Sequence, residues 1–279
     1  MSIKTTVITG PTSGLGKVTA QELAKKDYAL YLLVRNTEKG EELRKELIAQ
    51  TGNQAIHVIK CDVSDLQSVR DAAAELNAKL FNINVLINNA GAAFPERTLS
   101  KDGFEMSFAL NHLGHFLLTE SLMPLLKKGH ARVINVSSDA HRSAKPDFDD
   151  LQIEKSYAGL KAYGISKLFN IYFTKSLAEK YQQTGITAYV LHPGVVNTNI
   201  WNRAKGLLGV IIGLMKPFMI TPQKGAETII YLATQPKLEQ KSGLYFKKCK
   251  VAKTASNADN AAARNRLWEI SEKLSGLKK

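Results

Sequence analysis

The chain has 279 residues, of which 44% are hydrophobic and 23% are charged, and its formal net charge is +13. This balance is ordinary for a globular protein that buries a substantial core. Its two cysteines, Cys61 and Cys249, exclude a disulfide scaffold and a cysteine-rich zinc module. The histidines show no metal-ligand spacing either, because His112 and His115 lack an evident third ligand. We therefore expect no metal site.

More than half of the excess charge lies near the C-terminus, where residues 237–279 hold 11 Lys/Arg against 4 Asp/Glu. A basic surface can attract nucleic acid, anionic lipid or phosphorylated small molecules. The simpler interpretation is a soluble, lysine-rich surface. The sequence has no RNP-type aromatic motif, zinc finger or long basic block, so we expect no nucleic-acid partner.

The first residues lead directly into a predicted strand rather than into a long apolar segment with a cleavage site. We therefore expect no secretory signal. No apolar run approaches about 18 residues, so we expect no transmembrane helix. Together with the few cysteines, these features favour a cytoplasmic protein.

Short apolar runs alternate with segments of helical spacing along the whole chain. In chain order, the predicted elements are strand 5–9, a helix carrying Leu15, Val18, Leu23 and Ala24, strand 29–34, helix 37–50, strand 55–60, a helix from a capping box at 64–67 to about Leu80, strand 85–87, helix 103–127 bent near Pro124, strand 132–136, helix 163–181, strand 187–191, helix 222–234, strand 243–247 and helix 260–274. Strands that alternate with helices predict a parallel sheet covered on both faces. With no internal repeat or linker, we expect a single doubly wound α/β domain of the Rossmann type over residues 1–279.

A glycine-rich turn joins the first predicted strand to the first helix and reads Thr-Gly-Pro-Thr-Ser-Gly-Leu-Gly at 9–16. Glycine allows a tight turn and a close approach to phosphate, and the helix N-terminus offers free N–H groups. A mere turn is the alternative. On the first interpretation, the residues that bind a dinucleotide are Gly10, Thr12, Ser13, Gly14, Leu15 and Gly16.

The end of the second strand distinguishes between two cofactors. An acidic residue there would hydrogen-bond a ribose 2′-hydroxyl and repel a 2′-phosphate. The sequence instead has Arg35 and Asn36, and arginine pairs bidentately with phosphate. We therefore expect NADP(H) rather than NAD(H). The alternative is that Arg35 only points to solvent.

Two further segments follow predicted strands. Asp62 and Val63 come after the third strand, where an adenine edge can be recognised. Asn89, Ala90 and Gly91 come after the fourth strand and let the backbone pass close to a ribose. Because the carboxyl ends of parallel strands meet at one edge of the sheet, these residues and the glycine turn predict one dinucleotide crevice.

Tyr163 and Lys167 lie four residues apart on a predicted helix, so both side chains share one face. The nearby ammonium favours the tyrosinate and is expected to lower the pKa of Tyr163 from its usual value of about 10. Tyr163 is then a candidate proton donor to a carbonyl, or proton acceptor from an alcohol. Taken alone, such a pair more often marks an ordinary core or surface tyrosine.

Two further polar residues support a catalytic role for Tyr163 and Lys167. Ser138 ends the fifth predicted strand, where its hydroxyl can hold a substrate oxygen. Ser137 competes with it, and because side chains alternate along a strand only one of the two faces the crevice; we choose Ser138. Asn111 lies inside a predicted helix, where asparagine is disfavoured, and is a candidate to hold a water that links to Lys167.

As a set, these residues closely resemble the motifs of the short-chain dehydrogenase/reductase superfamily. The matching elements are Thr-Gly-x-x-x-Gly-x-Gly at 9–16, Asn-Asn-Ala-Gly at 88–91, Asn111, Ser138, Tyr163-x-x-x-Lys167 and Pro193-Gly194. The roles that the resemblance implies are acid/base catalysis for Tyr163, binding of the nicotinamide ribose and tuning of the tyrosine for Lys167, substrate orientation for Ser138 and support of a proton relay for Asn111. The cofactor contacts that it adds are Pro193, Gly194, Val196 and Thr198.

A narrower similarity is to the retinol dehydrogenase group and its relatives of the WW-domain oxidoreductase type. The segments that carry it are Asn-His-Leu-Gly-His-Phe at 111–116, Val-Ser-Ser-x-Ala-His at 136–141, the spacer at 147–151, Ser-Gly-Leu-Tyr-Phe at 242–246 with Cys249, and Arg-Leu-Trp-Glu at 266–269. Together with the cofactor choice that Arg35 indicates, this similarity predicts an NADPH-dependent oxidoreductase. Gly164-Ile165 stands where the family often has Cys-His, so we expect a lipophilic aldehyde, ketone or alcohol rather than a retinoid in particular.

Two alternatives to this activity stay open. Plant-type protochlorophyllide reductases share the same arrangement of motifs. The reduction of a ring C=C bond is therefore the first alternative. A protein that binds NADPH and regulates without turnover is the second alternative, and the intact catalytic set argues against it.

Residues 195–225 contain an apolar segment at Leu207–Met215. In this fold we expect the segment to form a lid over the substrate, and an apolar lid implies an apolar substrate. A core-packed helix is one alternative. Peripheral contact with a membrane, helped by Lys205, Lys216 and the basic tail, is another. We expect a monomer or homodimer that acts on a small lipophilic substrate.

Overall fold

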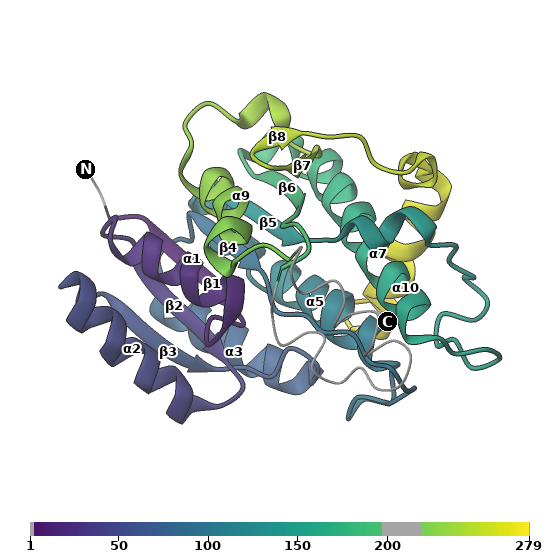
Figure 1. Cartoon of the computed structure of the whole chain (residues 1–279), viewed down its shortest axis with the longest axis horizontal. Helices are drawn as coiled ribbons and strands as arrows, with labels where there is room; N and C mark the ends of the chain where they lie inside the picture. Colours follow the sequence, from purple (N-terminus) through teal and green to yellow (C-terminus); the bar gives the residue numbers. More distant parts are fainter. Residues whose placement is uncertain (1–2, 197–218, 279) are drawn as a thin grey trace.

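The computed structural model describes residues 3–196 and 219–278, which build one eight-stranded sheet (Figure 1). The strands are β1 (Thr5–Thr9), β2 (Ala29–Val34), β3 (Ile56–Lys60), β4 (Val85–Asn88), β5 (Arg132–Val136), β6 (Thr187–His192), β7 (Tyr245–Lys247) and β8 (Lys250–Val251). Their order is β3-β2-β1-β4-β5-β6-β7-β8, and neighbouring strands are parallel except β7 and β8. The predicted parallel α/β sheet is confirmed.

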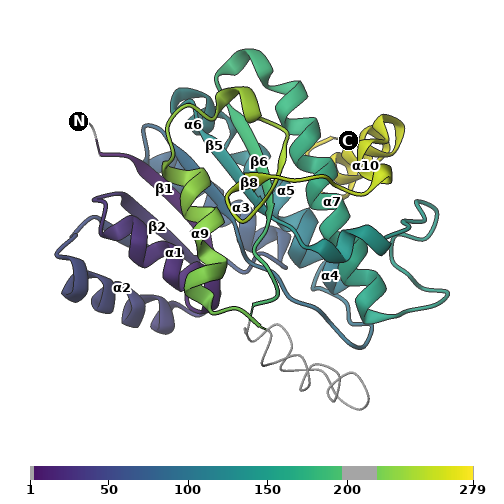
Figure 2. The same ribbon diagram turned by 45° about the horizontal axis from the view of Figure 1, so that its top comes forward.

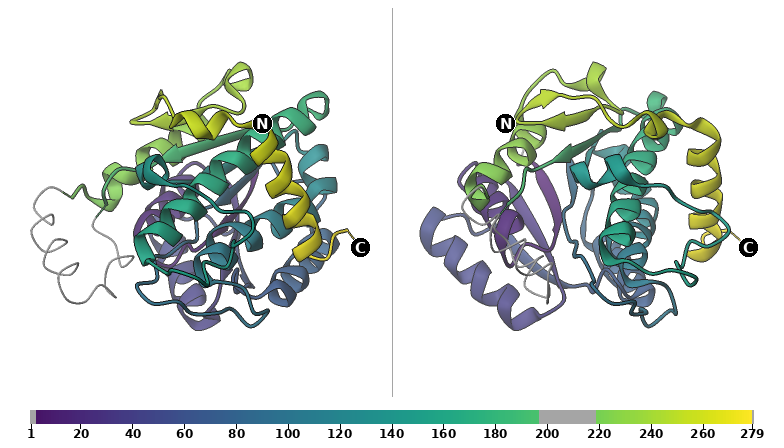
Figure 3. Two further views of the ribbon diagram at one scale, coloured as in Figure 1. Left: turned by 90° about the vertical axis from the view of Figure 1, so that its right-hand side faces the viewer. Right: turned by 45° about the vertical axis from the view of Figure 1, so that its right-hand side comes forward.

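Helices cover both faces of this sheet. The helices are α1 (Gly14–Ala24), α2 (Thr37–Thr51), α3 (Leu66–Lys79), α4 (Met106–Phe108), α5 (Gly114–Ser121), α6 (Met123–Lys128), α7 (Gly159–Lys180), α9 (Pro222–Thr234) and α10 (Ala261–Leu274). Figures 1 and 2 show α1, α2 and α9 over one face and α3, α5 and α7 over the other. The C-terminal helix α10 packs outside α7 (Figure 3). Among the described residues, no helix has the length and apolar character needed to cross a membrane.

The central strands are buried on both faces, which explains their continuous apolar runs. On β1, Val7 belongs to the apolar core shared with α3, α5 and α7, whereas Ile8 belongs to the core shared with α1, α2 and α9. Both side chains are fully buried. In the first core, Trp268 of α10 packs edge-to-face on Phe116 of α5 at 5.0 Å between ring centres. The doubly wound architecture follows from these two cores.

The strand order reverses direction between β1 and β4. β1 lies between β2 and β4, so the chain leaves β1 toward one side and returns on its other side as β4. The connections after β1 and β4 therefore diverge. In open α/β sheets, ligands bind in the crevice that such a divergence leaves at the carboxyl ends of the strands.

The prediction of one helix over residues 103–127 is wrong. The structure has α4, a π-helical turn η1 (Ala109–Leu113), α5 and α6 instead. The first turn starts at Met106 because the Glu105 carboxylate caps it, accepting from the N–H groups of Ser107 and Phe108. The helix breaks at Leu122, close to the predicted bend, because Pro124 has no N–H to donate.

The start of α3 also differs from the predicted capping box. Asp65, not Ser64, is the N-cap, because its carboxylate accepts from the Ser68 N–H at 3.1 Å. The Ser64 hydroxyl instead donates to the Asp62 carboxylate at 2.7 Å. The sequence could not show which of the two residues is the N-cap, since serine and aspartate side chains accept the same capping hydrogen bond.

The short strand β8 escaped the sequence analysis. Lys248 and Cys249 have φ of +52° and +60°, and they form a two-residue turn between the antiparallel strands β7 and β8. Such turns favour glycine and asparagine, and neither is present here. The tertiary structure therefore imposes a turn that the local sequence does not indicate.

Candidate active site

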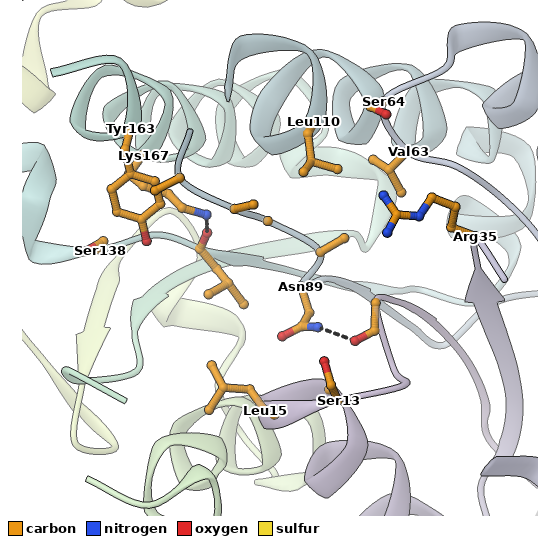
Figure 4. A pocket seen from close by; sticks show the side chains of 18 of the residues that line it. Ser13, Leu15, Arg35, Val63, Ser64, Asn89, Leu110, Ser138, Tyr163 and Lys167 are labelled. Carbon is orange, nitrogen blue, oxygen red and sulfur yellow. Dashed lines mark hydrogen bonds between the residues drawn. The ribbon is translucent and has the colours of Figure 1, made fainter. Parts of the chain in front are cut away.

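A cleft of about 680 Å³ opens at the carboxyl ends of the strands (Figure 4). Its walls come from the segments after β1 to β6 and from α7. The predicted site residues that line it are Gly10, Thr12, Ser13, Gly14, Leu15, Gly16, Arg35, Asp62, Val63, Asn89, Ala90, Gly91, Ser138, Tyr163, Lys167, Pro193, Gly194 and Val196. Asn36 and Asn111 do not belong to this lining, and Thr198 lies outside the described residues.

The glycine turn forms one end of the cleft. Gly10 and Gly14 have φ of +63° and +54°, a left-handed backbone that favours glycine. A Cβ at Gly16 would lie 2.2 Å from the Gly10 carbonyl oxygen, so glycine is needed for α1 to approach the turn this closely. Ser13 makes no side-chain cap to α1, which leaves the first N–H groups of the helix for an anion. This cradle fits the pyrophosphate of a dinucleotide.

Asn89 holds the glycine turn in place. Its Nδ2 donates to the carbonyl oxygens of Thr9 and Gly10 at 2.9 and 3.1 Å. In return, the Thr9 hydroxyl accepts from the N–H groups of Asn89 and Ala90. The Asn89 amide faces the turn because the two carbonyls there require donors. The predicted approach of the backbone at 89–91 to a ribose stays a prediction.

The end of β2 brings positive charge to the cleft. Arg35 is exposed and lines the cleft, and within the described ranges its guanidinium forms no ion pair. Asn36 instead caps α2, its side chain accepting from the Lys39 N–H at 2.9 Å. Lys101 also lines the cleft, paired with Asp65 at 2.6 Å.

Asp62 and Val63 line the wall that follows β3. The Asp62 carboxylate accepts from the N–H and the hydroxyl of Ser64 at 3.0 and 2.7 Å, which fixes its orientation. Figure 4 shows Val63 and Ser64 on the same side of the cleft as Arg35. This wall and the end of β2 therefore face the same part of the cleft.

Tyr163 and Lys167 reach the cleft from α7, which begins at Gly159, one turn earlier than predicted. Both side chains are buried. The Lys167 Nζ lies 5.5 Å from the centre of the Tyr163 ring and donates to the Val136 carbonyl at 3.1 Å. The Tyr163 hydroxyl points toward Ser138 in Figure 4. The structure thus brings the three predicted side chains together.

The expected lowering of the Tyr163 pKa is wrong. Burial raises the pKa of Tyr163 to about 12, and the nearby Ser138 hydroxyl lowers it only in part. Burial also lowers the pKa of Lys167 to about 8. Because both groups are withdrawn from water, the cost of ionising the phenol outweighs its attraction to the ammonium.

Ser137 and Ser138 point in opposite directions, as side-chain alternation at the end of β5 requires. The Ser137 hydroxyl is buried and donates to the Lys167 carbonyl at 2.7 Å. The Ser138 hydroxyl accepts from the Ala140 N–H at 3.2 Å and faces Tyr163. The structure therefore presents Ser138, rather than Ser137, to the tyrosine.

Asn111 lies in the π-helical turn η1 and is fully buried. Its Oδ1 accepts from the Ala92 N–H, and its Nδ2 donates to the Ala92 carbonyl and the Ser166 hydroxyl, each at 2.9 Å. A Cβ at Gly91 would lie 2.9 Å from Asn111 Oδ1 and 3.1 Å from Lys167 Nζ. Asn111 thus joins the loop after β4 to α7, with both amide hydrogens in use. Its part in a proton relay stays a prediction.

The family of the chain follows from comparison with known proteins. The model of the family described as short chain dehydrogenase matches residues 4–206, well over half of the chain. The chain belongs to the short-chain dehydrogenases. It is therefore an oxidoreductase that uses a nicotinamide cofactor and acts on CH–OH or C=O groups.

Individual relatives of this short-chain dehydrogenase cover nearly its whole length. Mouse retinol dehydrogenase 12 is 43% identical over 98% of this chain and 87% of that protein. Human retinol dehydrogenase 11 is 42% identical over 98% of this chain and 86% of that protein. Among solved structures, an uncharacterized protein from Mycobacterium paratuberculosis has a TM-score of 0.79 and 32% identity, covering 98% of this chain and 93% of its own. The predicted resemblance to the retinol dehydrogenase group is confirmed.

A more distant structure shows the shared fold alone. NADPH-bound carbonyl reductase from chicken fatty liver has a TM-score of 0.69 at 22% identity, over 91% of this chain and 100% of that chain. The predicted Rossmann-type architecture is thus found in solved structures as well as in the strand order of this protein.

A polar cluster that no sequence pattern predicted supports Ser138 in this short-chain dehydrogenase. The Asp139 carboxylate accepts from the Tyr245 hydroxyl at 3.0 Å and from the Lys247 ammonium at 2.6 Å, and its N–H donates to His192 at 3.3 Å. Partial burial opposes ionisation, but the hydrogen bond from Lys247 and the other donors lower the pKa of Asp139 to about 2. The end of β5 is thereby tied to β6 and β7. Asp139 and Tyr245 lie 106 positions apart, so no local pattern indicates the cluster.

Further apolar residues line the cleft. They are Ala93, Phe94, Leu99, Met106, Leu110 and Val195. The first three come from the loop after β4, which the sequence analysis treated only as a ribose contact. The run Ala-Ala-Phe directly after Gly91 is the signal that could have found them. Most of the predicted lid, residues 197–218, lies outside the described residues.

Proposed function

We propose that this short-chain dehydrogenase interconverts a lipophilic aldehyde or ketone and its alcohol with NADP(H). The observation that carries the proposal is the cleft in which Tyr163, Ser138 and Lys167 meet at the open edge of the sheet, with the glycine cradle in the same lining. The apolar lining supports a lipophilic substrate. Retinol dehydrogenases 11 and 12 among the relatives support it too, since retinol is a lipophilic alcohol.

In the proposed reduction, the cofactor supplies the hydride that reaches the carbonyl carbon. Ser138 donates a hydrogen bond to the carbonyl oxygen and orients it toward Tyr163. Because the pKa of Tyr163 is about 12, the phenol is protonated at neutral pH and can give its proton to the developing alkoxide. Lys167 has a pKa of about 8, so it is cationic below that pH and stabilises the phenolate that results. Oxidation of the alcohol is the reverse.

The proposed cofactor site runs from the glycine cradle to the end of β2. The N–H groups at the start of α1 bind the pyrophosphate. Arg35 pairs with the 2′-phosphate, which NADPH carries and NADH lacks. The remaining cleft residues that we assign to the adenine, the ribose and the nicotinamide are Asp62, Val63, Ala90, Gly91, Pro193, Gly194 and Val196.

The test of this function is NADPH oxidation by the purified full chain with a panel of lipophilic aldehydes and ketones, with NADH in parallel. Tyr163→Phe removes the proton donor but keeps the ring, so we expect kcat to fall by about 10²–10⁴-fold. The Kd of NADPH, measured by its fluorescence, should stay at the wild-type value.

Three results would count against the proposal. Wild-type turnover in Tyr163→Phe would remove the tyrosine from the chemistry. NADPH binding without oxidation by any compound of the panel would favour a cofactor-binding protein without turnover. Faster reaction with NADH than with NADPH would overturn the role of Arg35.

A further inference from the structure

Tyr157 belongs to a second polar cluster, beside the cleft but outside the proposed catalytic residues. Its hydroxyl lies 2.8 Å from the Phe94 carbonyl oxygen and 3.2 Å from Oε1 of Glu105. Phe94 lines the cleft, and most of the residue is buried. The tyrosine therefore joins a residue of the cleft wall to a carboxylate.

This carboxylate is unusual because Glu105 is only 1% exposed and forms no ion pair with any described residue. Its oxygens accept from the N–H groups of Ser107 and Phe108 at 2.9 and 2.8 Å, and its own N–H donates to Gln152 at 2.6 Å. A buried carboxylate without a cation is costly unless hydrogen bonds satisfy it. The single hydrogen of the Tyr157 hydroxyl is shared between this carboxylate and the nearer Phe94 carbonyl oxygen, so the position of the hydroxyl is closely determined.

The catalytic helix contacts the same part of the wall. A Cβ at Gly159 would lie 2.3 Å from the Phe94 carbonyl oxygen and 2.9 Å from the Cα of Pro95. Gly159 begins α7, which carries Tyr163 one turn later. The Phe94 backbone is therefore held between a hydrogen bond from Tyr157 and the first turn of α7. Its distance from the proposed proton donor is set by these two contacts.

We propose that Tyr157 and Glu105 are positioning residues that hold Phe94 as the wall against which the hydrocarbon part of the substrate packs. This inference rests on the proposed function and deepens it, because it names a determinant of the substrate class. A long or bulky apolar substrate contacts the wall and gains binding energy from it, whereas a short one does not. The pair thus favours large lipophilic carbonyl compounds over small ones.

The first experiment measures kcat/KM for all-trans-retinal and for hexanal in Tyr157→Phe. The variant keeps the ring but frees the Phe94 carbonyl and removes a donor to Glu105. We expect KM for retinal to rise about tenfold and the retinal-to-hexanal ratio of kcat/KM to fall accordingly. An unchanged ratio would overturn the inference.

Tyr181→Phe is the matched control. The Tyr181 hydroxyl donates to the largely buried Glu120 at 2.8 Å, which is the same kind of contact, but neither residue lines the cleft. We expect this variant to keep the wild-type ratio. An equal fall in both variants would mean that any lost tyrosine–glutamate contact has this effect, and the inference would fail.

A double-mutant cycle separates positioning from general weakening of the fold. Phe94→Ala removes the wall itself and should lower the same ratio. If Tyr157 acts through Phe94, then Tyr157→Phe should have little further effect on the ratio in the Phe94→Ala background. Fully additive effects would show that Tyr157 acts elsewhere.

Hydrogen exchange of the same variants does not depend on turnover. Tyr157→Phe should speed the exchange of amides in residues 92–99 and 106–108, whereas Tyr181→Phe should not. If this pattern appears but the wild type reduces neither aldehyde, the proposed function fails while the positioning contact stands. Unchanged exchange in residues 92–99 of Tyr157→Phe would overturn the inference even in an active enzyme.

Discussion

The two halves of the cleft are constructed by different means. The half around Gly10 and Gly16 consists mainly of backbone, and it depends on the absence of side chains where α1 meets the turn. The half around Ser138 and Tyr163 is held by side chains that are distant in sequence, as in the hydrogen bond from Ser137 to the Lys167 carbonyl. The glycine half therefore requires positions without a side chain, and the half around Ser138 and Tyr163 requires hydrogen-bond partners.

This difference predicts two kinds of response to mutation. A single added methyl group should disable the backbone half, because close-packed backbone cannot yield locally. In the side-chain half, a substitution that keeps the catalytic residues but removes one of their supporting contacts should lower kcat only in part, because several hydrogen bonds hold each catalytic side chain.

Among Gly16→Ala, Arg35→Ala and Asp139→Asn, the first should have the largest effect. The added Cβ would lie 2.2 Å from the Gly10 carbonyl oxygen and 2.7 Å from Asn89 Nδ2, so the turn or α1 has to move. We expect the Kd of NADPH to rise about 100-fold, which corresponds to about 2.7 kcal/mol, in a fluorescence titration.

Gly52→Ala is the control for this substitution. Gly52 also has a positive φ of +74°, but no atom lies within 4 Å of an added Cβ. It should destabilise the protein by about 1 kcal/mol through backbone strain and leave the Kd of NADPH unchanged. Wild-type affinity in Gly16→Ala would contradict the account of the backbone half.

Arg35→Ala should have an intermediate effect, because it removes one exposed charge from a site that the backbone otherwise holds. A charge-assisted hydrogen bond contributes about 1.5–3 kcal/mol, so we expect KM for NADPH to rise at least about tenfold. KM for NADH, which has no 2′-phosphate, should not change. Equal loss toward both cofactors would place Arg35 outside the phosphate site.

Asp139→Asn should have the smallest effect, since the amide keeps the shape and one acceptor of the carboxylate. We expect kcat to fall only a few fold and the free energy of unfolding to fall by less than about 1 kcal/mol. Asp149→Asn is a control at an exposed ion pair away from the cleft, with no expected change in kcat. A loss of kcat as large as in Tyr163→Phe would contradict the graded response.

The pH dependence of this stability difference has a defined sign. The folded-state pKa of Asp139 is lowered to about 2 from its usual 3.8, so the contribution of its carboxylate is present above pH 3.8 and is lost as the pH falls through about 2. In denaturant unfolding, the difference between the wild type and Asp139→Asn should shrink over that range. A difference that persists below pH 2 would show that charge is not its cause.

Local sequence patterns were enough to predict an element where residues adjacent in sequence determine its conformation. The apolar run at residues 29–34 marked β2, and the glycine spacing at 9–16 marked the turn that now forms the cradle. The same reasoning failed over residues 103–127, where the Glu105 carboxylate and the Asn111 amide determine how the helix starts and winds. Asn111 takes its partners from Ala92 and Ser166, which no helical periodicity reveals.

The sequence by itself determined the alternation of strands and helices, and with it the parallel sheet, the position of the crevice and the family motifs. Only the tertiary structure decided that Ser138 faces Tyr163, that Tyr163 stays protonated, and that Phe94 forms a wall of the cleft. The physical reason is that burial and hydrogen-bond partners arise between distant residues, such as Tyr157 and Phe94, which are 63 positions apart. Periodicity records which face of an element is apolar, but not which polar atom lies opposite it.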